Sequence, residues 1–130
     1  MKIPFEYCAK DYAAYRPSYP PELYDFLVER CSLKPSSLIV DIGAGTGKGS
    51  TLFLDRGFRV VAIDAGESML RLAPQPERVI AFAEDIPLST SIADLVLCPQ
   101  SFHWFATANT LREFRRILKT MGKLALAWNT

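Results

Sequence analysis

The 130-residue sequence predicts an α/β fold in which a mostly parallel sheet carries helices on both faces. The first observation is a series of short segments rich in valine, isoleucine and leucine that alternate with helical patterns. The second is that most of these segments are nearly continuous apolar runs, which is typical of strands buried on both faces. The third is a glycine-rich stretch directly after the first of these segments, where a strand turns into a helix.

Strands and helices are expected to alternate along the chain. The strands are predicted at residues 37–42, 59–64, 78–82, 93–98 and 123–128. The helices are predicted at residues 21–30, 48–56, 67–72 and 109–121. Pro21 suits the first turn of the first helix, and Gly57 is the expected end of the second. Residues 84–92 combine proline with serine and threonine and are expected to form a loop.

The last helix is predicted from the spacing of its apolar residues. Those that recur at helical spacing are Leu111, Phe114, Leu118 and Met121. Gly122 follows them as the expected end of the helix.

The composition favours a single globular domain over residues 1–130. With 49% apolar and 22% charged residues, a disordered or fibrous chain is excluded. Fifteen basic and fourteen acidic residues leave a net charge of +1, so the surface is not built to neutralise the phosphates of a nucleic acid. No apolar run approaches the roughly 20 residues that cross a bilayer, which predicts no membrane association.

The cysteine and histidine content predicts a cytoplasmic protein without a metal site. Cys8, Cys31 and Cys98 are odd in number and widely spaced, and the N-terminus has no apolar signal core. The sequence has one histidine and no cluster of cysteine and histidine, which argues against bound zinc.

The glycine-rich stretch is the clearest candidate for a ligand site. Residues 41–49 read DIGAGTGKG, and a backbone without side chains lets a ligand approach closely. A phosphate-binding P-loop requires serine or threonine after the Gly-Lys pair, where Gly49 stands. The dinucleotide fingerprint G-x-G-x-x-G requires glycine at position 48 or 50, where Lys48 and Ser50 stand. Neither motif fits, and the pattern D-x-G-x-G-x-G remains.

This pattern resembles motif I of the class I S-adenosylmethionine-dependent methyltransferases. The resemblance implies a Rossmann-like core with the strand order 3-2-1-4-5. It also implies that Gly43, Gly45 and Gly47 pack under the methionine part of S-adenosyl-L-methionine. Asp64 ends the second predicted strand, and the resemblance implies that it accepts hydrogen bonds from both ribose hydroxyls. Asp41 is expected to orient the glycine turn, or to be an ordinary residue of a strand end.

The likeness continues along nearly all of the chain. Residues 83–87 resemble the loop that holds adenine, and residues 100–105 resemble the loop after the fourth strand. Residues 12–20 are similar to the N-terminal cap of a small-molecule branch that includes trans-aconitate-type methyltransferases. Residues 1–35 are therefore expected to form a cap and a helix, and residues 36–130 the core. The cofactor site that the resemblance implies consists of Asp41, Gly43, Gly45, Gly47, Asp64, Ala65, Met69, Ala83, Glu84, Asp85 and Gln100.

Two departures from the family pattern have consequences. Many relatives carry aspartate just before the Ala-Glu pair of the adenine loop, where this chain has Phe82. A contact to the adenine amino group is then expected from Glu84, Asp85 or the backbone, or it is absent. The family also continues to a helix and a terminal antiparallel hairpin, whereas this sequence ends at Thr130, which suggests a truncated chain. An uncovered fifth strand is expected to favour a homodimer through its edge.

The loop after the fourth strand and the N-terminal segment supply the candidate substrate residues. His103 is the only histidine and is expected either to act as a general base or to anchor its loop through hydrogen bonds. Trp104 and Phe105 are expected either to face the sulfonium or substrate, or to belong to the core. A lid over the site is the prediction for three further residues, with a surface arm as the alternative: Tyr12, Tyr15 and Arg16.

The sequence thus suggests an S-adenosyl-L-methionine-dependent methyltransferase that acts on a small molecule. The resemblance to the small-molecule branch suggests a carboxylic acid as the acceptor. A non-catalytic or incomplete cofactor-binding module is one alternative. An NAD(P)-dependent oxidoreductase is another, although the glycine spacing speaks against it. Asp64 also has a second interpretation, as a helix cap or a solvated loop charge.

Overall fold

The computed structural model describes residues 19–99 and 107–127. Its helices are α2 (Pro21–Arg30), α3 (Thr51–Asp55), α4 (Glu67–Leu70) and α5 (Ala108–Ile117). Its strands are β1 (Leu38–Ile42), β2 (Arg59–Asp64), β3 (Glu77–Ile80), β4 (Ala93–Pro99) and β5 (Leu118–Ala127). Within these two ranges, no helix has the length and apolar character that crossing a membrane requires.

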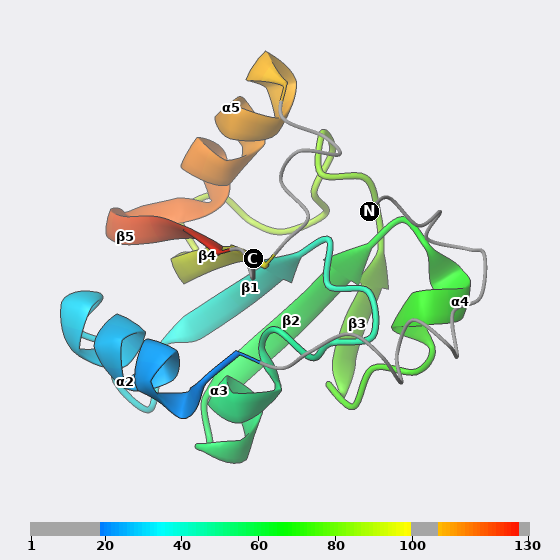
Figure 1. The fold of residues 1–130 in the computed structure, drawn as a ribbon. Helices are drawn as coiled ribbons and strands as arrows, with labels where there is room; N and C mark the ends of the chain where they lie inside the picture. The colour runs from blue at the N-terminus through cyan, green and yellow to red at the C-terminus, as the bar shows by residue number, and fades with distance from the viewer. Residues whose placement is uncertain (1–18, 100–106, 128–130) are drawn as a thin grey trace.

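The strands form one sheet in the order β3-β2-β1-β4-β5, and every neighbouring pair is parallel (Figure 1). β1 and β4 are neighbours at the centre, so the direction of strand addition reverses between them. In open parallel sheets, ligands bind beyond the carboxyl ends of the strands at this switch point. The predicted α/β class, the parallel sheet and its strand order are confirmed.

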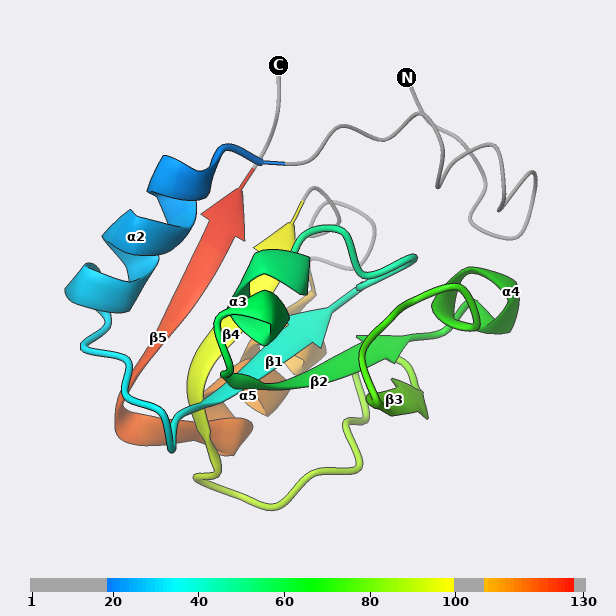
Figure 2. The same cartoon turned by 90° about the horizontal axis from the view of Figure 1, so that it is seen from below.

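Helices cover both faces of the sheet (Figure 2). α2 and α3 pack on one face, where Phe53 of α3 contacts a core that includes Ile39. α5 packs on the other face, where Phe114 belongs to a core that includes Val40. All five residues of β1 are buried, because successive side chains enter opposite cores. This double burial explains why the strand reads as an uninterrupted apolar run.

α5 is shorter than the predicted helix, and the prediction was wrong at its end. The helix ends at Ile117, and Leu118 has extended backbone angles (φ −73°, ψ 137°) as the first residue of β5. The carbonyl oxygen of Arg116 accepts a hydrogen bond from the N–H of Ser91 at 2.9 Å. That of Ile117 accepts one from the N–H of Ile92 at 2.8 Å. The loop before β4 therefore satisfies carbonyl groups that a longer helix would have used internally.

Gly122 lies in β5 and does not end a helix. Leu118 pairs with Ala93, and pairing then resumes with Lys123 opposite Leu95, so the register shifts between them. A Cβ atom on Gly122 would lie 2.9 Å from the carbonyl oxygen of Ala93. Glycine is therefore required for the close approach of β4 and β5 at this irregularity.

Three further boundaries differ from prediction near the carboxyl ends of the strands. α4 ends at Leu70, two residues before the predicted end of that helix. α3 begins at Thr51, since residues 43–50 stay in turns. β3 ends at Ile80, so Phe82 lies beyond the strand and is 73% exposed. The carbonyl oxygen of Phe82 accepts a hydrogen bond from the N–H of Asp85 at 3.1 Å, which opens the loop toward β4.

Candidate functional site

A glycine turn, residues 43–50, leaves the carboxyl end of β1 and leads into α3. Gly43, Gly45 and Gly47 have φ angles of 68°, 57° and 82°, in the left-handed region that other residues rarely adopt. The alternating glycines are thus required by the backbone itself. Their spacing leaves a bend without side chains at the switch point of the sheet.

Asp64, the last residue of β2, lies against this turn. Its carboxylate accepts hydrogen bonds from the N–H of Gly45 at 2.7 Å and from the N–H of Gly66 at 2.6 Å. The residue is only 4% exposed. The N–H of Ala44 also donates a hydrogen bond to the carbonyl oxygen of Ile63 at 3.0 Å, so the glycine turn and the end of β2 are joined through the main chain as well. Asp64 is therefore not a solvated loop charge, and its role toward ribose stays a prediction.

Asp41 lies under the turn and is fully buried. Its carboxylate accepts a hydrogen bond from the Ser50 hydroxyl at 2.5 Å, which connects the end of β1 to the start of α3. Asp41 pairs with Ala62 on the neighbouring parallel strand, two residues before Asp64, so both buried carboxylates lie toward the same end of the sheet. Such a cluster favours a cationic ligand group.

Gln75 is a site residue that no motif of the sequence indicates. It is 1% exposed, and its Nε2 donates to the carbonyl oxygen of Gly47 at 3.0 Å and to the Ser50 hydroxyl at 2.9 Å. A Cβ atom on Gly47 would lie 2.2 Å from Gln75 Oε1. Because Gln75 stands between two prolines in a polar segment, the sequence shows only a loop there.

Two hydroxyl groups bind carbonyl oxygens in the second half of the turn, residues 47–49. Tyr24 of α2 donates to the carbonyl oxygen of Gly49 at 2.7 Å, in a buried position. Thr51 donates to the carbonyl oxygen of Gly47 at 2.7 Å. The turn is therefore fixed by α2, by α3 and by the segment after α4. Tyr24 is a second contributor that belongs to no motif of the sequence.

The predicted adenine residues begin a loop beside the end of β2. The N–H of Ala81 donates to the carbonyl oxygen of Asp64 at 3.1 Å, which joins this loop to the ribose candidate. Ala83 is buried, whereas Glu84 and Asp85 are exposed. Of the two residues predicted after Asp64, Ala65 is exposed and Met69 is fully buried in α4.

Several predicted site residues lie outside the described residues. These are Gln100, His103, Trp104 and Phe105 after β4, and Tyr12, Tyr15 and Arg16 before α2.

Cys98 lies in β4 and is fully buried. Burial, together with the nearby charge of Asp41, raises the pKa of the Cys98 thiol, which keeps it protonated and unreactive. Within residues 19–99 and 107–127, no group of three or more potential metal ligands is present.

Sequence comparison relates the chain to methyltransferases. A family model described as a methyltransferase domain matches residues 40–126. An uncharacterized methyltransferase of Mycobacterium tuberculosis is 38% identical over 134 residues, which cover 100% of this chain and 54% of that protein. A malonyl-[acyl-carrier protein] O-methyltransferase of Geobacter sulfurreducens is 33% identical over 99 residues, which cover 68% of this chain and 37% of that protein. The chain spans about half the length of the first of these relatives.

Structural comparison gives the same result. A crystal structure from Methanococcus maripaludis, described as an S-adenosyl-L-methionine-dependent methyltransferase, matches with a TM-score of 0.83 and 25% identity. The match covers 99% of this chain and 66% of that one. The glycine turn and Asp64 both fall within the segment that the family model matches. The chain therefore belongs to the methyltransferase domain family, within the class I S-adenosylmethionine-dependent methyltransferases.

Proposed function

We propose that this chain binds S-adenosyl-L-methionine and forms the cofactor-binding core of a methyltransferase for a small molecule. The observation that carries the proposal is the glycine turn at the switch point, with the buried carboxylate of Asp64 in contact with it. Family membership supports the same cofactor.

The groups around the turn suit this cofactor. Within the described residues, the Thr46 hydroxyl is buried in the turn and has no hydrogen-bond partner. A buried unpaired hydroxyl costs about 1–3 kcal/mol, so a polar ligand at the turn would relieve that cost. The carboxylates of Asp41 and Asp64 favour a positively charged sulfonium and ammonium group.

We assign the parts of the cofactor to three segments. Gly43, Gly45 and Gly47 would hold the methionine part. Asp64 would accept the ribose hydroxyls, because its carboxylate lies at the end of β2 and against the glycine turn. Residues 83–85 would hold adenine, since their loop is joined to Asp64 through Ala81.

When bound, S-adenosyl-L-methionine supplies an activated methyl group for direct in-line displacement. The contribution of the protein is alignment of the acceptor with that group, which is worth up to about 7–11 kcal/mol. No protein nucleophile is needed for such a transfer, because the acceptor attacks the methyl group directly.

We propose a carboxylate as the methyl acceptor. The likeness to the Geobacter sulfurreducens malonyl-[acyl-carrier protein] O-methyltransferase supports an oxygen acceptor. A carboxylate is ionised at neutral pH and needs no general base. A hydroxyl acceptor would need one, and His103 is then the candidate from the sequence.

Calorimetric titration tests the cofactor. We expect S-adenosylhomocysteine to bind and NAD not to bind. Asp64→Ala should weaken S-adenosylhomocysteine binding about a hundredfold, the loss of about 3 kcal/mol expected for two charge-assisted hydrogen bonds. Because Asp64 also holds Gly45 and Gly66, thermal melting without ligand must accompany the titration. Glu67→Ala, an exposed acidic residue three positions away, is the matched control.

A methyl-transfer assay across carboxylic acids tests the reaction. Formation of a methyl ester on one member of the panel supports the proposal. S-adenosylhomocysteine binding without transfer to any carboxylic, hydroxyl or amine acceptor indicates a non-catalytic module. Stabilisation by NAD alone indicates an oxidoreductase and contradicts the proposal.

A further inference from the structure

The connection between β3 and β4, residues 81–92, is long and contains neither helix nor strand. It carries Ala83, Glu84 and Asp85, the segment assigned to adenine. Long loops in compact domains keep one path only when other elements hold them. Glu84 and Asp85 are exposed, so the contacts that fix their position must come from the neighbouring residues of the loop.

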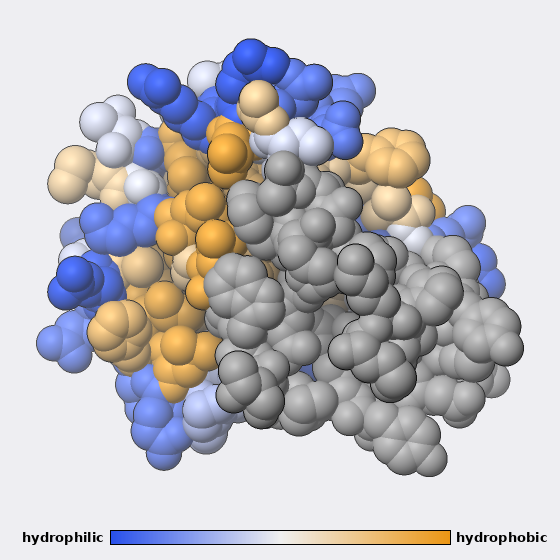
Figure 3. Space-filling view, turned by 45° about the horizontal axis from the view of Figure 1, so that its top comes forward, coloured by the Kyte–Doolittle hydropathy of each residue, from blue (hydrophilic) through white to orange (hydrophobic). Residues whose placement is uncertain are grey.

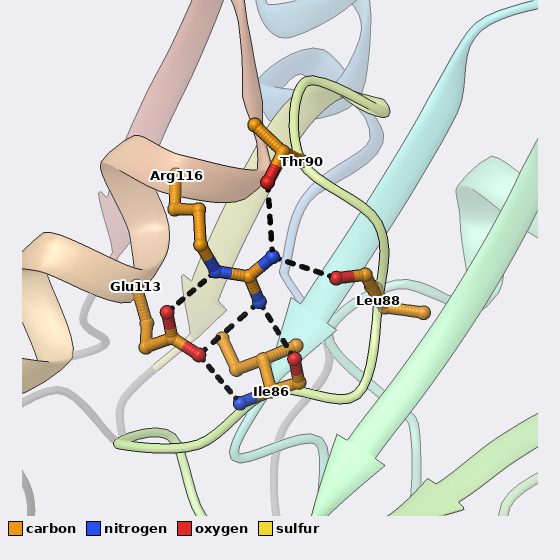
Figure 4. Close-up of polar contacts among 5 residues, drawn as sticks. All are labelled: Ile86, Leu88, Thr90, Glu113 and Arg116. Carbon is orange, nitrogen blue, oxygen red and sulfur yellow. Dashed lines mark hydrogen bonds and ion pairs between the residues drawn. The ribbon is translucent and has the colours of Figure 1, made fainter.

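Two side chains of α5 bind the main chain of this loop (Figure 4). Glu113 Oε1 accepts a hydrogen bond from the N–H of Ile86 at 2.8 Å. One terminal nitrogen of Arg116 donates to the carbonyl oxygen of Ile86 at 2.7 Å. The other donates to the carbonyl oxygen of Leu88 at 2.8 Å and contacts the Thr90 hydroxyl at 3.4 Å. Ile86 is therefore held at both its N–H and its carbonyl group.

The two side chains also bind each other. Arg116 Nε lies 2.6 Å from Glu113 Oε2, and Arg116 Nη2 lies 3.2 Å from Glu113 Oε1. They are three positions apart on one helix, so the helix fixes their relative placement. The guanidinium group has enough donors to bind Glu113 and two carbonyl oxygens at once, which a lysine ammonium cannot match in a planar arrangement.

Apolar packing adds to this clamp, the pair Glu113 and Arg116. Ile86 is 2% exposed and belongs to the same buried cluster as Phe114 and Ile117 of α5. Ala83, at the start of the adenine segment, belongs to that cluster too. Ile86 is held in place and directly follows Asp85. The position of residues 83–85 therefore depends on the contacts of Ile86.

We infer that Glu113 and Arg116 are positioning residues for adenine recognition, acting through the backbone of residues 86–90. This inference rests on the proposed function, since it requires S-adenosyl-L-methionine at the glycine turn. The clamp is partly exposed, with 33% of the Arg116 side chain and 17% of the Glu113 side chain accessible to solvent. Its hydrogen bonds to the loop go to peptide groups and to the Thr90 hydroxyl, and the positive charge of Arg116 also attracts the Asp85 carboxylate. Its effect on the ligand is therefore exerted by the placement of residues 83–85.

Calorimetry on the full chain tests the inference with two probes. S-Inosylhomocysteine differs from S-adenosylhomocysteine in carrying an oxygen in place of the adenine amino group. We expect wild-type protein to prefer the adenine ligand. Arg116→Met should weaken S-adenosylhomocysteine binding about tenfold and reduce that preference, because the adenine contacts lose their placement. Arg115→Met, on the neighbouring exposed arginine, should change neither quantity.

Hydrogen exchange on the same variants separates positioning from general instability. Peptides covering residues 81–92 should exchange faster in Arg116→Met, while peptides covering the glycine turn should not change. If Arg116→Met does not fold, Arg116→Lys and Glu113→Gln replace it, with a smaller loss of affinity expected in each.

The outcomes separate the inference from the proposed function. A folded Arg116→Met variant with unchanged affinity and unchanged preference overturns the inference alone. Equal weakening of both probes, with exchange increased throughout the chain, also overturns it. Failure of the wild-type chain to bind S-adenosylhomocysteine overturns the proposed function, and the inference with it.

Discussion

Gln75 holds the glycine turn from behind, through hydrogen bonds to the Gly47 carbonyl and the Ser50 hydroxyl. Ser50 in turn donates to Asp41, and Asp64 holds Gly45 from the other side. All of these contacts are made between groups of the chain itself. The turn is therefore preorganised, and ligand binding is spared the entropic cost of ordering it.

Gly47→Ala tests how closely Gly47 packs against the Gln75 side chain. The new Cβ would overlap Gln75 Oε1 and would force alanine to a φ of 82°, so we expect a loss of about 2–4 kcal/mol in unfolding free energy. Denaturant unfolding of wild type and variant measures this loss of unfolding free energy. Gly57→Ala is the matched control, because its φ is 88° but no atom lies within 4 Å of its new Cβ. We expect about 1 kcal/mol there.

A double-mutant cycle isolates the contact with Gln75. Gln75→Ala removes the overlapping amide, so the cost of Gly47→Ala should fall in that background to the value for Gly57→Ala. Strictly additive effects would mean that the overlap is relieved elsewhere and would contradict the proposed packing.

The helices, strands and turns that the sequence predicted correctly are those that depend on burial and on backbone geometry. β1 and β2 were found because both faces of these strands are buried, and the turn because glycines at alternate positions need positive φ. The end of α5 was missed, since the partners of its last carbonyls are Ser91 and Ile92, far away in the sequence. Gln75 was missed for the same reason, because its partners come from another segment.

The stabilisation that Glu113 of the clamp provides should decrease at low pH. The Arg116 hydrogen bond, followed by that of the Ile86 N–H, lowers the pKa of Glu113 below its ordinary value. In the unfolded chain Glu113 titrates near the ordinary value of about 4.3, so its stabilising effect is complete above that pH. The effect is lost as the pH falls through the lower pKa of the folded state.

Thermal melting of wild type and Glu113→Gln across pH measures this contribution. We expect wild type to melt higher near neutral pH, by an amount that shrinks below about pH 4 as Glu113 becomes protonated. Glu22→Gln, an exposed residue on α2, controls for general charge effects. A difference between wild type and Glu113→Gln that stays constant down to low pH would show that the charge on Glu113 is irrelevant.

For the whole molecule, the sheet has β3 at one edge and β5 at the other. Among the described residues, no strand pairs with the outer side of β5. Met121 is 81% exposed, and Leu124 and Leu126 are also exposed. Figure 3 shows apolar surface gathered in one band on the side of the molecule where β5 lies. An edge strand with exposed apolar side chains favours pairing with a further strand, either of the same protein or of a second copy.

We propose that two copies of this chain associate through β5. Size-exclusion chromatography with light scattering should give the mass of a dimer, and Leu126→Lys should shift the chain to monomer, because a charge on the edge opposes pairing. Phe26→Lys, on an apolar residue of α2 that is 56% exposed against 38% for Leu126, should leave the dimer intact. A monomeric wild-type chain at micromolar concentration would contradict the proposal.

The hydrogen bonds between α5 and the loop of residues 81–92 determine which positions of that loop can change during evolution. Glu113 and Arg116 bind peptide groups, which every amino acid carries, so mutations at positions 87 and 89 leave these bonds intact. Position 86 is closed to proline, whose nitrogen has no hydrogen to offer Glu113. Variation in the loop can therefore explore new ligand preferences on an unchanged scaffold, which makes this segment a natural target for directed diversification.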